Sequence, residues 1–362
     1  MGAICFFNTA KAWGGGEKWH FEVSSYLHQN GHNVKVFARK DSVLLQRLQE
    51  AGIPSEGVHI TNLSFLNPFK RWSIQKMLQK GNFETIVMNL SRDIKIAGPC
   101  AKKANIARII YRRGSAIPIK NTSLNRHYFK NILTEILANS EATKKTILEN
   151  NPKLFPVDKI KVIYNGIDID SINQTAANEN HSQHKEIQLV NLGRLEFQKN
   201  QEFLVRLSKK LKDKNVPHKM IIGGSGRLKE KLEHLVRQLD VTDTVELAGF
   251  IDNPIPFMQK GDVFVLPSLW EGFGYVLAEA ALCKKPIIAF DVSSNPELVV
   301  HQKTGFLVPL NNLDSFANKV ITLYNQPDLR TQMGEAGYQH ITTHFDKKKQ
   351  IKKIEAYLIN GA

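Results

Sequence analysis

Cysteine is scarce in this chain. The 362 residues contain only Cys5, Cys100 and Cys283, which lie far apart in apolar surroundings. An odd number at this spacing argues against a disulfide framework or a cysteine-based metal centre, and fits buried thiols in a reducing compartment. We therefore expect a cytoplasmic protein.

Long hydrophobic runs are also missing. No apolar stretch approaches the roughly 20 residues that a membrane-spanning helix needs. The apolar start, Met1 to Phe7, is short and lacks the basic n-region of a signal peptide. It therefore predicts a first strand and not a signal peptide.

Metal-binding patterns are equally sparse. No cluster of His, Cys, Asp and Glu has the spacing of a metal site. Asp168 and Asp170 form an Asp-x-Asp pair that we interpret as a chance feature of a turn. The run Gly14–Gly16 lacks the Lys-Ser/Thr of a phosphate-binding P-loop. We expect neither a metal nor an organic cofactor.

Positive charge is abundant and unevenly placed. The chain carries a formal charge of +15, and residues 1–165 hold 25 Lys/Arg against 11 Asp/Glu, whereas residues 166–362 hold 24 against 23. A field concentrated on one half attracts an anionic partner to that half. Nucleic acid, an anionic membrane surface and a phosphorylated acceptor are all candidates.

The stretch 262–297 shows the organisation of the chain. An apolar strand at 263–266 is followed by a loop, by a helix from Tyr275 to Leu282 and by a second apolar strand at 286–290. The N-terminal half repeats this order around Gly14–Gly16. Alternating strands and helices predict an α/β fold with doubly wound parallel sheets, in which ligands bind beyond the carboxyl ends of the strands.

The loop 271–274 has the chemistry of an anion site. Gly272 and Gly274 let the backbone approach a ligand closely, and the following helix start offers unpaired N–H groups to a diphosphate. Glu271 and Glu279 could accept hydrogen bonds from sugar or ribose hydroxyls. The alternative for each glutamate is a solvated side chain.

These residues resemble the signature of the retaining glycosyltransferases of family 4: Glu271, seven residues and then Glu279, with Leu-Pro-Ser before the loop and Gly-Phe-Gly within it. The resemblance implies that Glu271 contacts the donor sugar and that Glu279 binds the ribose of the nucleotide. One departure is the run 283–286, Cys-Lys-Lys-Pro, where the family usually has a small residue and Gly before Lys-Pro.

Other matches extend the resemblance. Gly193, Arg194 and Lys199 resemble the family's Gly-Arg-x(4)-Lys, whose cations hold the donor diphosphate, so Arg194, Lys199 and Glu271 are the implied catalytic residues. The remaining implied contacts with the nucleotide sugar are made by Gly15, Gly16, Gly193, Ile251, Gly272, Phe273, Gly274 and Glu279.

The family resemblance implies the GT-B architecture. It has two facing Rossmann-like, doubly wound domains: an acceptor-binding domain at 1–166, to which a C-terminal helix at 343–362 crosses back, and a donor-binding domain at 167–342. The polar residues 178–185 read as a linker. The implied reaction moves a sugar from a nucleotide diphosphate sugar to a hydroxyl with retention. The basic first half suggests an anionic glycan or glycolipid acceptor, such as lipopolysaccharide core at the inner membrane face.

Several alternatives remain open. A phosphorylase or an epimerase could use the same scaffold, and the basic half could serve a membrane- or nucleic-acid-binding protein without transferase activity. No recognised nucleic-acid-binding motif appears, so we expect no nucleic-acid partner. Arg112 and Arg113 stand where many family members have a histidine, and they could bind phosphate or an anionic acceptor by bidentate contacts. The stretch 67–80 is either an interfacial element that uses Phe69 and Trp72 or an ordinary amphipathic helix packed on the sheet with Ile74, Met77 and Leu78 inward.

Overall fold

The chain divides into two compact units. The computed structural model describes residues 2–170, 172 and 186–361. Unit 1 comprises Met1–Asn165 and Lys348–Ala362, and unit 2 comprises Gly166–Lys347. The predicted linker at 178–185 lies outside the described residues.

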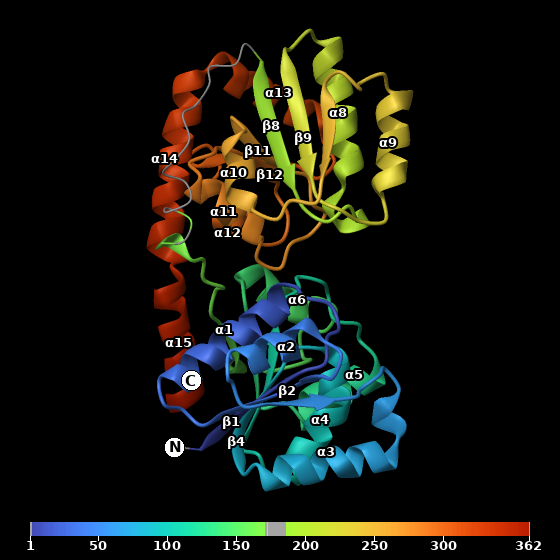
Figure 1. The fold of residues 1–362 in the computed structure, drawn as a ribbon, viewed down its shortest axis with the longest axis vertical. Helices are drawn as coiled ribbons and strands as arrows, with labels where there is room; N and C mark the ends of the chain where they lie inside the picture. Colours follow the sequence, from blue (N-terminus) through green and yellow to red (C-terminus); the bar gives the residue numbers. More distant parts are fainter. Residues whose placement is uncertain (1, 171, 173–185, 362) are drawn as a thin grey trace. The chain divides into compact units, whose positions relative to one another are not determined.

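Unit 1 is built on a seven-stranded parallel sheet with the order β3-β2-β1-β4-β5-β6-β7 (Figure 1). Its strands are β1 (Ala3–Asn8), β2 (Val34–Arg39), β3 (Ser55–Val58), β4 (Phe83–Met88), β5 (Arg108–Arg113), β6 (Glu135–Ala138) and β7 (Ile160–Val162). Its helices are α1 (Gly15–Gln29), α2 (Val43–Glu50), η1 (Ser64–Leu66), α3 (Pro68–Lys80), α4 (Ser91–Lys103), α5 (Ser123–Asn131), α6 (Glu141–Leu148), η2 (Val157–Lys159) and α15 (Lys347–Asn360).

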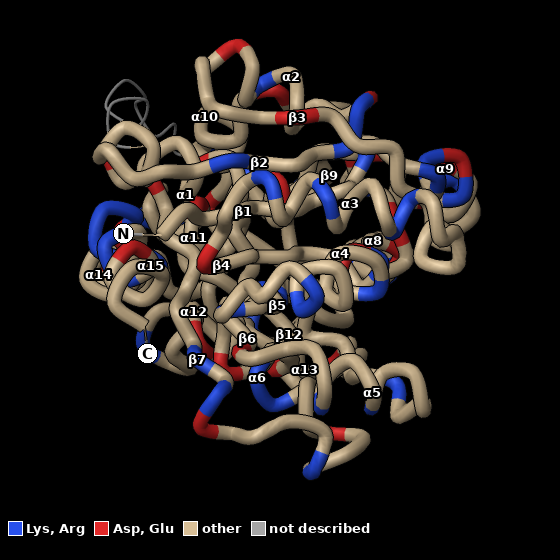
Figure 2. Tube along the Cα trace, turned by 90° about the horizontal axis from the view of Figure 1, so that it is seen from below, with Lys and Arg blue, Asp and Glu red and all other residues tan. Residues whose placement is uncertain are grey.

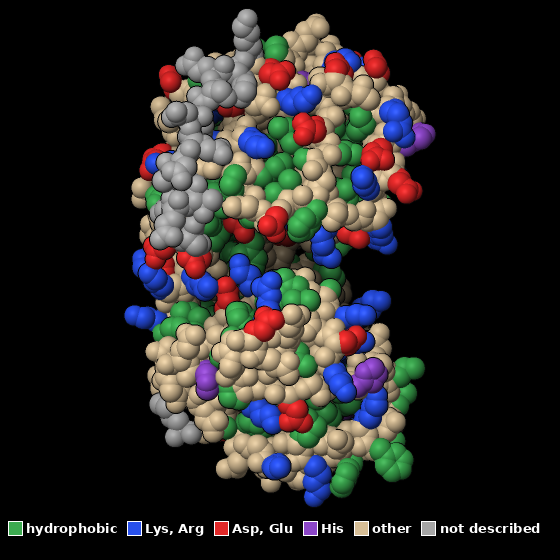
Figure 3. Space-filling view, in the orientation of Figure 1, with side chains coloured by type: hydrophobic (Ala, Val, Ile, Leu, Met, Phe, Trp, Pro, Cys, Tyr) green, Lys and Arg blue, Asp and Glu red, His purple; other side chains and the backbone are tan. Residues whose placement is uncertain are grey.

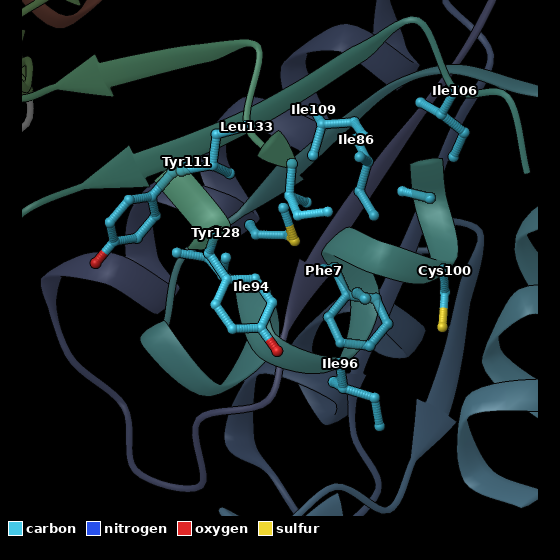
Figure 4. Close-up of a cluster of buried hydrophobic side chains, with 14 of the residues drawn as sticks. Phe7, Ile86, Ile94, Ile96, Cys100, Ile106, Ile109, Tyr111, Tyr128 and Leu133 are labelled. Carbon is cyan, nitrogen blue, oxygen red and sulfur yellow. The ribbon is translucent and has the colours of Figure 1, made fainter. Parts of the chain in front are cut away.

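The central strands of unit 1 are apolar because helices cover both faces of the sheet. Every residue of β1 is buried, as is typical of a strand in the middle of a parallel sheet. Side chains on one face join the cluster shown in Figure 4, which includes Phe7, Ile86 and Tyr128. Those on the other face, such as Phe6, pack against α1 and α15.

The C-terminal helix contacts the N-terminal unit, as predicted. Ile354 and Leu358 of α15 are buried in the cluster that contains β1 and α1. Glu355 accepts a hydrogen bond from Tyr26 at 3.1 Å and lies 2.8 Å from His32 Nε2. The outward face of α15 is lysine-rich, and Figure 2 shows blue segments along it.

Unit 2 contains a six-stranded parallel sheet with the order β10-β9-β8-β11-β12-β13. Its strands are β8 (Ile187–Leu192), β9 (His218–Gly223), β10 (Val245–Gly249), β11 (Val263–Leu266), β12 (Ile287–Phe290) and β13 (Gly305–Val308). Its helices are η3 (Phe197–Lys199), α8 (Gln201–Asp213), α9 (Lys229–Gln238), α10 (Pro254–Gln259), α11 (Tyr275–Leu282), α12 (Asn295–Leu298), α13 (Leu313–Asn325) and α14 (Pro327–His344).

Both sheets share one winding scheme, which places their ligand sites. In each unit the first strand lies at the centre, strands two and three extend to one side and the later strands to the other. This doubly wound order, predicted from the sequence, creates a switch point where neighbouring loops leave in opposite directions. In unit 2 that point lies between β8 and β11, which pair only at Leu189–Val263 and Val190–Phe264 before they separate.

None of the helices in the described part of the chain combines the length and the apolar character that a membrane span requires. The three cysteines are buried and free of disulfides.

Candidate active site

The loops after β8 and β9 are joined through their backbones. Gly193 N donates to Gly223 O at 3.0 Å, and Leu195 N donates to Ser225 O at 2.9 Å. A Cβ on Gly224 would lie 2.0 Å from the Gly193 carbonyl oxygen, and Gly224 has a φ of 137°. Only glycine satisfies both conditions. The two loops therefore form one rigid rim at the carboxyl end of the sheet.

Lys199 folds back over this rim from the short helix η3. A Cβ on Gly193 would lie 3.3 Å from both Cδ and Cε of Lys199, so the lysine stem runs along the exposed edge of the glycine. The start of α8 fixes the same turn, because Gln201 Nε2 donates to the Arg194 carbonyl at 3.0 Å. The turn thus points the Lys199 ammonium toward the loop after β11.

Glu271 lies in that second loop and pairs with Lys199. The Nζ–Oε1 distance is 2.5 Å, and the side chains are 14% and 8% exposed. Gln198 joins the two loops further, since its side chain donates to Trp270 O at 2.7 Å and its carbonyl accepts from Leu269 N at 2.8 Å. The cation and the acid, 72 residues apart, are brought together across the switch point.

The glycine loop passes from Glu271 into helix α11. Phe273 is buried between Tyr275 and Phe345, with ring centroids 5.2 and 5.6 Å away. Its ring therefore anchors the loop, and only its backbone is left to face a ligand. Gly274 caps the helix with a φ of 83°, and the first N–H groups of α11 point out of the helix start. Glu279 lies on the same helix and is half-buried.

Two other predicted residues lie on the loops of the same edge. Arg194 follows β8 directly and is exposed, and it has no ion-pair partner within the ranges that the structure describes. Ile251 follows β10 and is half-buried, close enough to β9 that a Cβ on Gly223 would come within 2.8 Å of its Cγ1. Its neighbour Phe250 is 74% exposed.

Four buried polar side chains around the switch point were not predicted from the sequence. They keep an oxygen without a hydrogen-bond partner among the described residues; the atoms are Asn191 Oδ1, Gln201 Oε1, Ser268 Oγ and Asn295 Oδ1. Buried acceptors and hydroxyls are normally satisfied, so their grouping indicates a place where water or a polar ligand completes the site. A polar residue near the end of a mostly apolar strand, as at Asn191 in β8, was the available signal.

The corresponding edge of unit 1 is organised differently. Gly15 and Gly16 form the first turn of α1, after Gly14 at its N-cap. A Cβ on Gly16 would lie 2.5 Å from Asn89 Nδ2, so the helix start packs tightly on the loop after β4. The buried carboxylate of Glu17 accepts from Asn8 at 3.2 Å and from Asn89 at 3.4 Å.

A second part of this network ties β1 to α4. The carboxylate of Asp93 accepts hydrogen bonds from the hydroxyl of Thr9, from Thr9 N at 3.4 Å and from Leu90 N at 3.2 Å. Arg92 donates to Thr9 Oγ1 at 3.0 Å. Burial raises the pKa of Asp93 to about 7, although these donors and Arg92 favour its charged form.

Arg112 belongs to the same network and is not an open cation. The residue is 3% exposed, and its guanidinium donates to Asn165 Oδ1 at 3.0 Å and to Asn89 Oδ1 at 3.3 Å and lies 5.0 Å from the Trp19 ring. The neighbouring His20 is fully buried, and burial together with Arg112 holds its pKa well below the usual range. Arg113 donates to Tyr111 and to the Ile117 carbonyl.

Metal-binding geometry is not seen in the residues that the structure describes: none of their His, Cys, Asp and Glu side chains form a group of three suited to a metal ion. Asp168 of the Asp-x-Asp pair lies 3.8 Å from Lys347 Nζ.

Two Rossmann-like units, with a cation, a buried acid and a glycine-led helix at the switch point of the second, define a GT-B glycosyltransferase. Residues 173–340 match the model of the glycosyl transferases group 1, and residues 13–171 match that of Glycosyltransferase Family 4. The chain belongs to this family of retaining glycosyltransferases, which transfer sugars from nucleotide sugars.

Relatives cover most of the chain. A Campylobacter jejuni N-acetylgalactosamine-N,N'-diacetylbacillosaminyl-diphospho-undecaprenol 4-alpha-N-acetylgalactosaminyltransferase is 28% identical over 86% of this chain and 85% of its own. An Escherichia coli UDP-Gal:alpha-D-GlcNAc-diphosphoundecaprenol alpha-1,3-galactosyltransferase is 26% identical over 83% and 81%. The crystal structure of Anabaena HepE with UDP superposes with a TM-score of 0.83 at 20% identity, covering 99% of this chain and all of HepE.

Proposed function

We propose that this protein moves a sugar from a UDP-sugar to a hydroxyl of a glycan carried on a polyprenyl diphosphate, in the synthesis of a cell-surface glycan such as lipopolysaccharide. Both named relatives act on a diphospho-undecaprenol glycan, and HepE was solved with UDP. The observation that carries the proposal is the Lys199–Glu271 pair at the switch point of unit 2.

In this proposal the donor lies along the carboxyl edge of unit 2. Arg194 and Lys199 bind the diphosphate, and the amides of residues 272–274 add hydrogen bonds at the start of α11. Glu271 orients the donor sugar while it holds Lys199 in place. Glu279 accepts from the ribose hydroxyls, and the base lies beside Ile251. In unit 1, Gly15 and Gly16 offer the opening amides of α1 to the donor phosphates.

The proposed reaction takes place on one face of the sugar. The bond from C1 to the diphosphate oxygen breaks, and the acceptor oxygen bonds to C1 on the same side. The acceptor proton passes to the departing phosphate oxygen, so no side chain has to act as the base. Negative charge grows on the UDP leaving group, and Arg194 and Lys199 stabilise that charge in the transition state.

The basic composition of unit 1 supports an anionic acceptor. The surplus of 14 positive charges lies in residues 1–165, and a polyprenyl diphosphate presents negative charge at a membrane surface. We therefore place the enzyme at the cytoplasmic face of that membrane, where the charge of unit 1 attracts both the acceptor and anionic lipids.

Binding of the donor is the first test. A thermal-shift series with UDP, GDP and ADP should show the largest stabilisation with UDP, because a ligand that binds only the native state raises its stability. Arg194→Ala should weaken UDP binding about 10- to 100-fold, whereas Arg237→Ala, an exposed arginine on α9, should not. Equal shifts with all three nucleotides would remove UDP from the proposal.

Product analysis is the second test. The protein is incubated with UDP-sugars and a polyprenyl diphosphate glycan, and the product is examined by mass spectrometry. We expect sugar on the glycan with an α linkage when the donor is α-linked. Release of a sugar 1-phosphate or of an epimerised donor, without transfer, would identify a phosphorylase or an epimerase instead.

A further inference from the structure

The exposed apolar side chains of this protein are not evenly spread. Twelve large hydrophobic residues of the described chain are at least 36% exposed, and four of them fall between positions 63 and 72. These four are Leu63 (70%), Leu66 (67%), Phe69 (82%) and Trp72 (64%). We call them the 63–72 patch. Such grouping marks an interaction surface, because isolated exposed hydrophobics are normal and contiguous ones are not.

The exposed residues of the patch lie on a different face of α3 from the residues that pack in the core. Helix α3 buries Ile74 and Leu78 in the main cluster of unit 1. With 3.6 residues per turn, Trp72 and Lys76 lie on the opposite side of the helix from Ile74. The helix is therefore packed against the sheet through one face and carries a second apolar group on its solvent face. The interpretation of residues 67–80 as a helix packed on the sheet is confirmed for the inner face. The interfacial role of Phe69 and Trp72 stays a prediction, and their exposure is compatible with it.

The patch is also held in a fixed position. Asn67 caps α3 by accepting from Lys70 N at 3.0 Å, and Pro68 opens the first turn. Ser64 Oγ accepts from Thr61 N at 2.9 Å, and Lys70 Nζ donates to the His59 carbonyl at 3.2 Å. These bonds fix the turn that presents the exposed side chains. Figure 3 shows hydrophobic side chains protruding at the lower right, where Figure 1 places the start of α3.

The charge around the patch identifies its partner. Residues 57–83 contain Lys70, Arg71, Lys76 and Lys80 and no acidic residue. Two copies of such a surface would repel each other, whereas an anionic lipid surface would attract it. Trp and Phe beside lysines is the composition that settles at the interface of a bilayer, with the rings among the headgroups and the cations toward the phosphates.

The position in the sheet fits this partner. The turn with Leu63 and Leu66 leaves the carboxyl end of β3, and in a parallel sheet this is the edge where the loops of β1 and β4 also emerge. A bilayer held there would lie at the same edge of unit 1 as the opening of α1. We propose that the 63–72 patch, with Arg71, Lys76 and Lys80, is the element that docks unit 1 on an anionic bilayer. This inference rests on the proposed lipid-linked acceptor.

The test uses the full chain and vesicle flotation. With vesicles of phosphatidylcholine mixed with phosphatidylglycerol, the wild type should float, and Phe69→Ser/Trp72→Ser should bind at least about tenfold more weakly. The matched control is Val157→Ser/Leu310→Ser, which removes two exposed hydrophobics outside the patch. Lys76→Glu/Lys80→Glu should also lose binding, whereas the equal charge change Lys260→Glu/Lys303→Glu in unit 2 should not. Pure phosphatidylcholine should bind the wild type less.

A second readout locates the contact. Lipids brominated in their acyl chains should quench the fluorescence of the wild type, and Trp72→Phe should remove most of that quenching while Trp13→Phe keeps it. Unchanged flotation of both patch variants would overturn the proposal. So would a change from dimer to monomer in Phe69→Ser/Trp72→Ser without any loss of lipid binding, because the patch would then serve a second copy of the chain.

Activity separates this inference from the proposed function. The patch variants should transfer sugar to a short-chain, water-soluble acceptor at the wild-type rate and lose transfer to the vesicle-embedded acceptor. If the wild type floats through its patch but transfers no sugar to either acceptor, the acceptor assignment fails and the docking site stands. If the patch variants match the wild type on embedded acceptor and in flotation, the docking site fails alone.

Discussion

The two units wind their sheets in the same order, yet the switch points of the two sheets differ in chemistry. In unit 2 the Lys199–Glu271 pair lies beside the exposed Arg194 and near buried oxygens that lack protein partners. In unit 1 the polar groups at the same place bond chiefly to one another, as Asp93 does with Thr9 and Arg112 with Asn165. The unit 2 edge therefore has cations and acceptors to offer a ligand, whereas the unit 1 edge is held mostly by its own hydrogen bonds. The exceptions at the unit 1 edge are the two ring nitrogens of His20 and Nε of Arg113, which have no hydrogen-bond partner among the described residues.

The difference shows that topology alone does not make a site. A doubly wound sheet brings loops together at its centre. The side chains on those loops decide whether the edge binds a ligand or only stabilises the fold. Arginine illustrates this: Arg194 is exposed after the first strand of unit 2, whereas Arg112 is 3% exposed in the last part of β5 in unit 1. Substitutions at the two edges should therefore act on different measurements, catalysis in unit 2 and stability in unit 1.

The largest effect is expected at Lys199. In Lys199→Ala the leaving diphosphate loses a cation and Glu271 loses its partner, so kcat should fall about 100- to 1,000-fold. Steady-state kinetics with a UDP-sugar would measure the loss. The double variant Lys199→Met/Glu271→Gln should recover melting temperature, because no charge is left buried alone, but should not recover activity. Near-normal kcat in Lys199→Ala would remove this residue from the catalytic set.

The matching change in unit 1 is Arg112→Met. It leaves the buried oxygen of Asn165 and the half-buried oxygen of Asn89 without this donor, and we expect the free energy of unfolding to drop by about 3 kcal/mol. Chemical denaturation would measure it, with Arg126→Met on the exposed side of α5 as the control. If Arg112→Met kept its stability and instead lost affinity for the donor, the contrast between the two edges would be wrong.

The sequence predicted the site residues of unit 2 better than the hydrogen-bond network of unit 1. Arg194, Lys199 and Glu271 stand in short local motifs, so their loops could be located, and the α/β order gave the doubly wound sheets. The pairing of Lys199 with Glu271 could not be seen, because it depends on β8 and β11 being neighbours although 72 residues separate the partners. The link between Thr9 and Asp93 spans 84 residues and has no motif at all.

Burial explains two further features that the sequence could not determine. The sequence left open whether residues 67–80 form an interfacial element that uses Phe69 and Trp72 or an ordinary helix packed on the sheet, because helical spacing gives the relative faces of a helix and not their surroundings. It also left Arg112 as a candidate phosphate ligand, since a basic residue at the end of a strand looks the same whether it is exposed or enclosed. Long-range packing determines whether each of these side chains is exposed or buried, and no local sequence pattern predicts that packing.

A pH series would sharpen the comparison further, through Asp93. Its pKa is raised by burial from the ordinary value to about 7, so between about pH 4 and 7 the native state holds a proton that the unfolded chain has released. Stability should therefore fall as pH rises through this window and level off above it. From pH 5 to 7 the loss attributable to Asp93 is about 2–3 kcal/mol.

Asp93→Asn removes that titration while keeping the size of the side chain. We expect its free energy of unfolding to be flatter than that of the wild type between pH 5 and 7, measured by urea denaturation at each pH. Asp328→Asn, at the start of α14 in unit 2, should leave the wild-type slope unchanged. Parallel curves for Asp93→Asn and wild type would show that this carboxyl group does not take up a proton in the native state near neutrality.

The smallest expected effect concerns the backbone beneath the unit 2 site. Helix α11, which carries Glu279, ends with Lys285 N bonded to Ala280 O and Lys284 N bonded to Ala281 O. This is the Schellman arrangement, which places Lys284 in the left-handed region with a φ of 54°. The family usually has glycine near this point, and the structure gives the reason: a side chain there costs about 1 kcal/mol.

Lys284→Gly removes that cost but also removes two side-chain contacts. One is the exposed ion pair with Glu335, whose Nζ–Oε2 distance is 2.7 Å, and the other is the contact of the ammonium with the Tyr338 ring, 5.3 Å from its centroid. Lys284→Ala loses the same two contacts and keeps a side chain on the left-handed backbone, so it is the matched control. The free energy of unfolding of Lys284→Gly should exceed that of Lys284→Ala by about 1 kcal/mol in urea denaturation. The rate of sugar transfer should stay unchanged in both variants, because Lys284 does not lie at the carboxyl edge of the sheet. Equal stabilities of the two variants would mean that the left-handed turn carries no strain, and the missing glycine would then need another explanation.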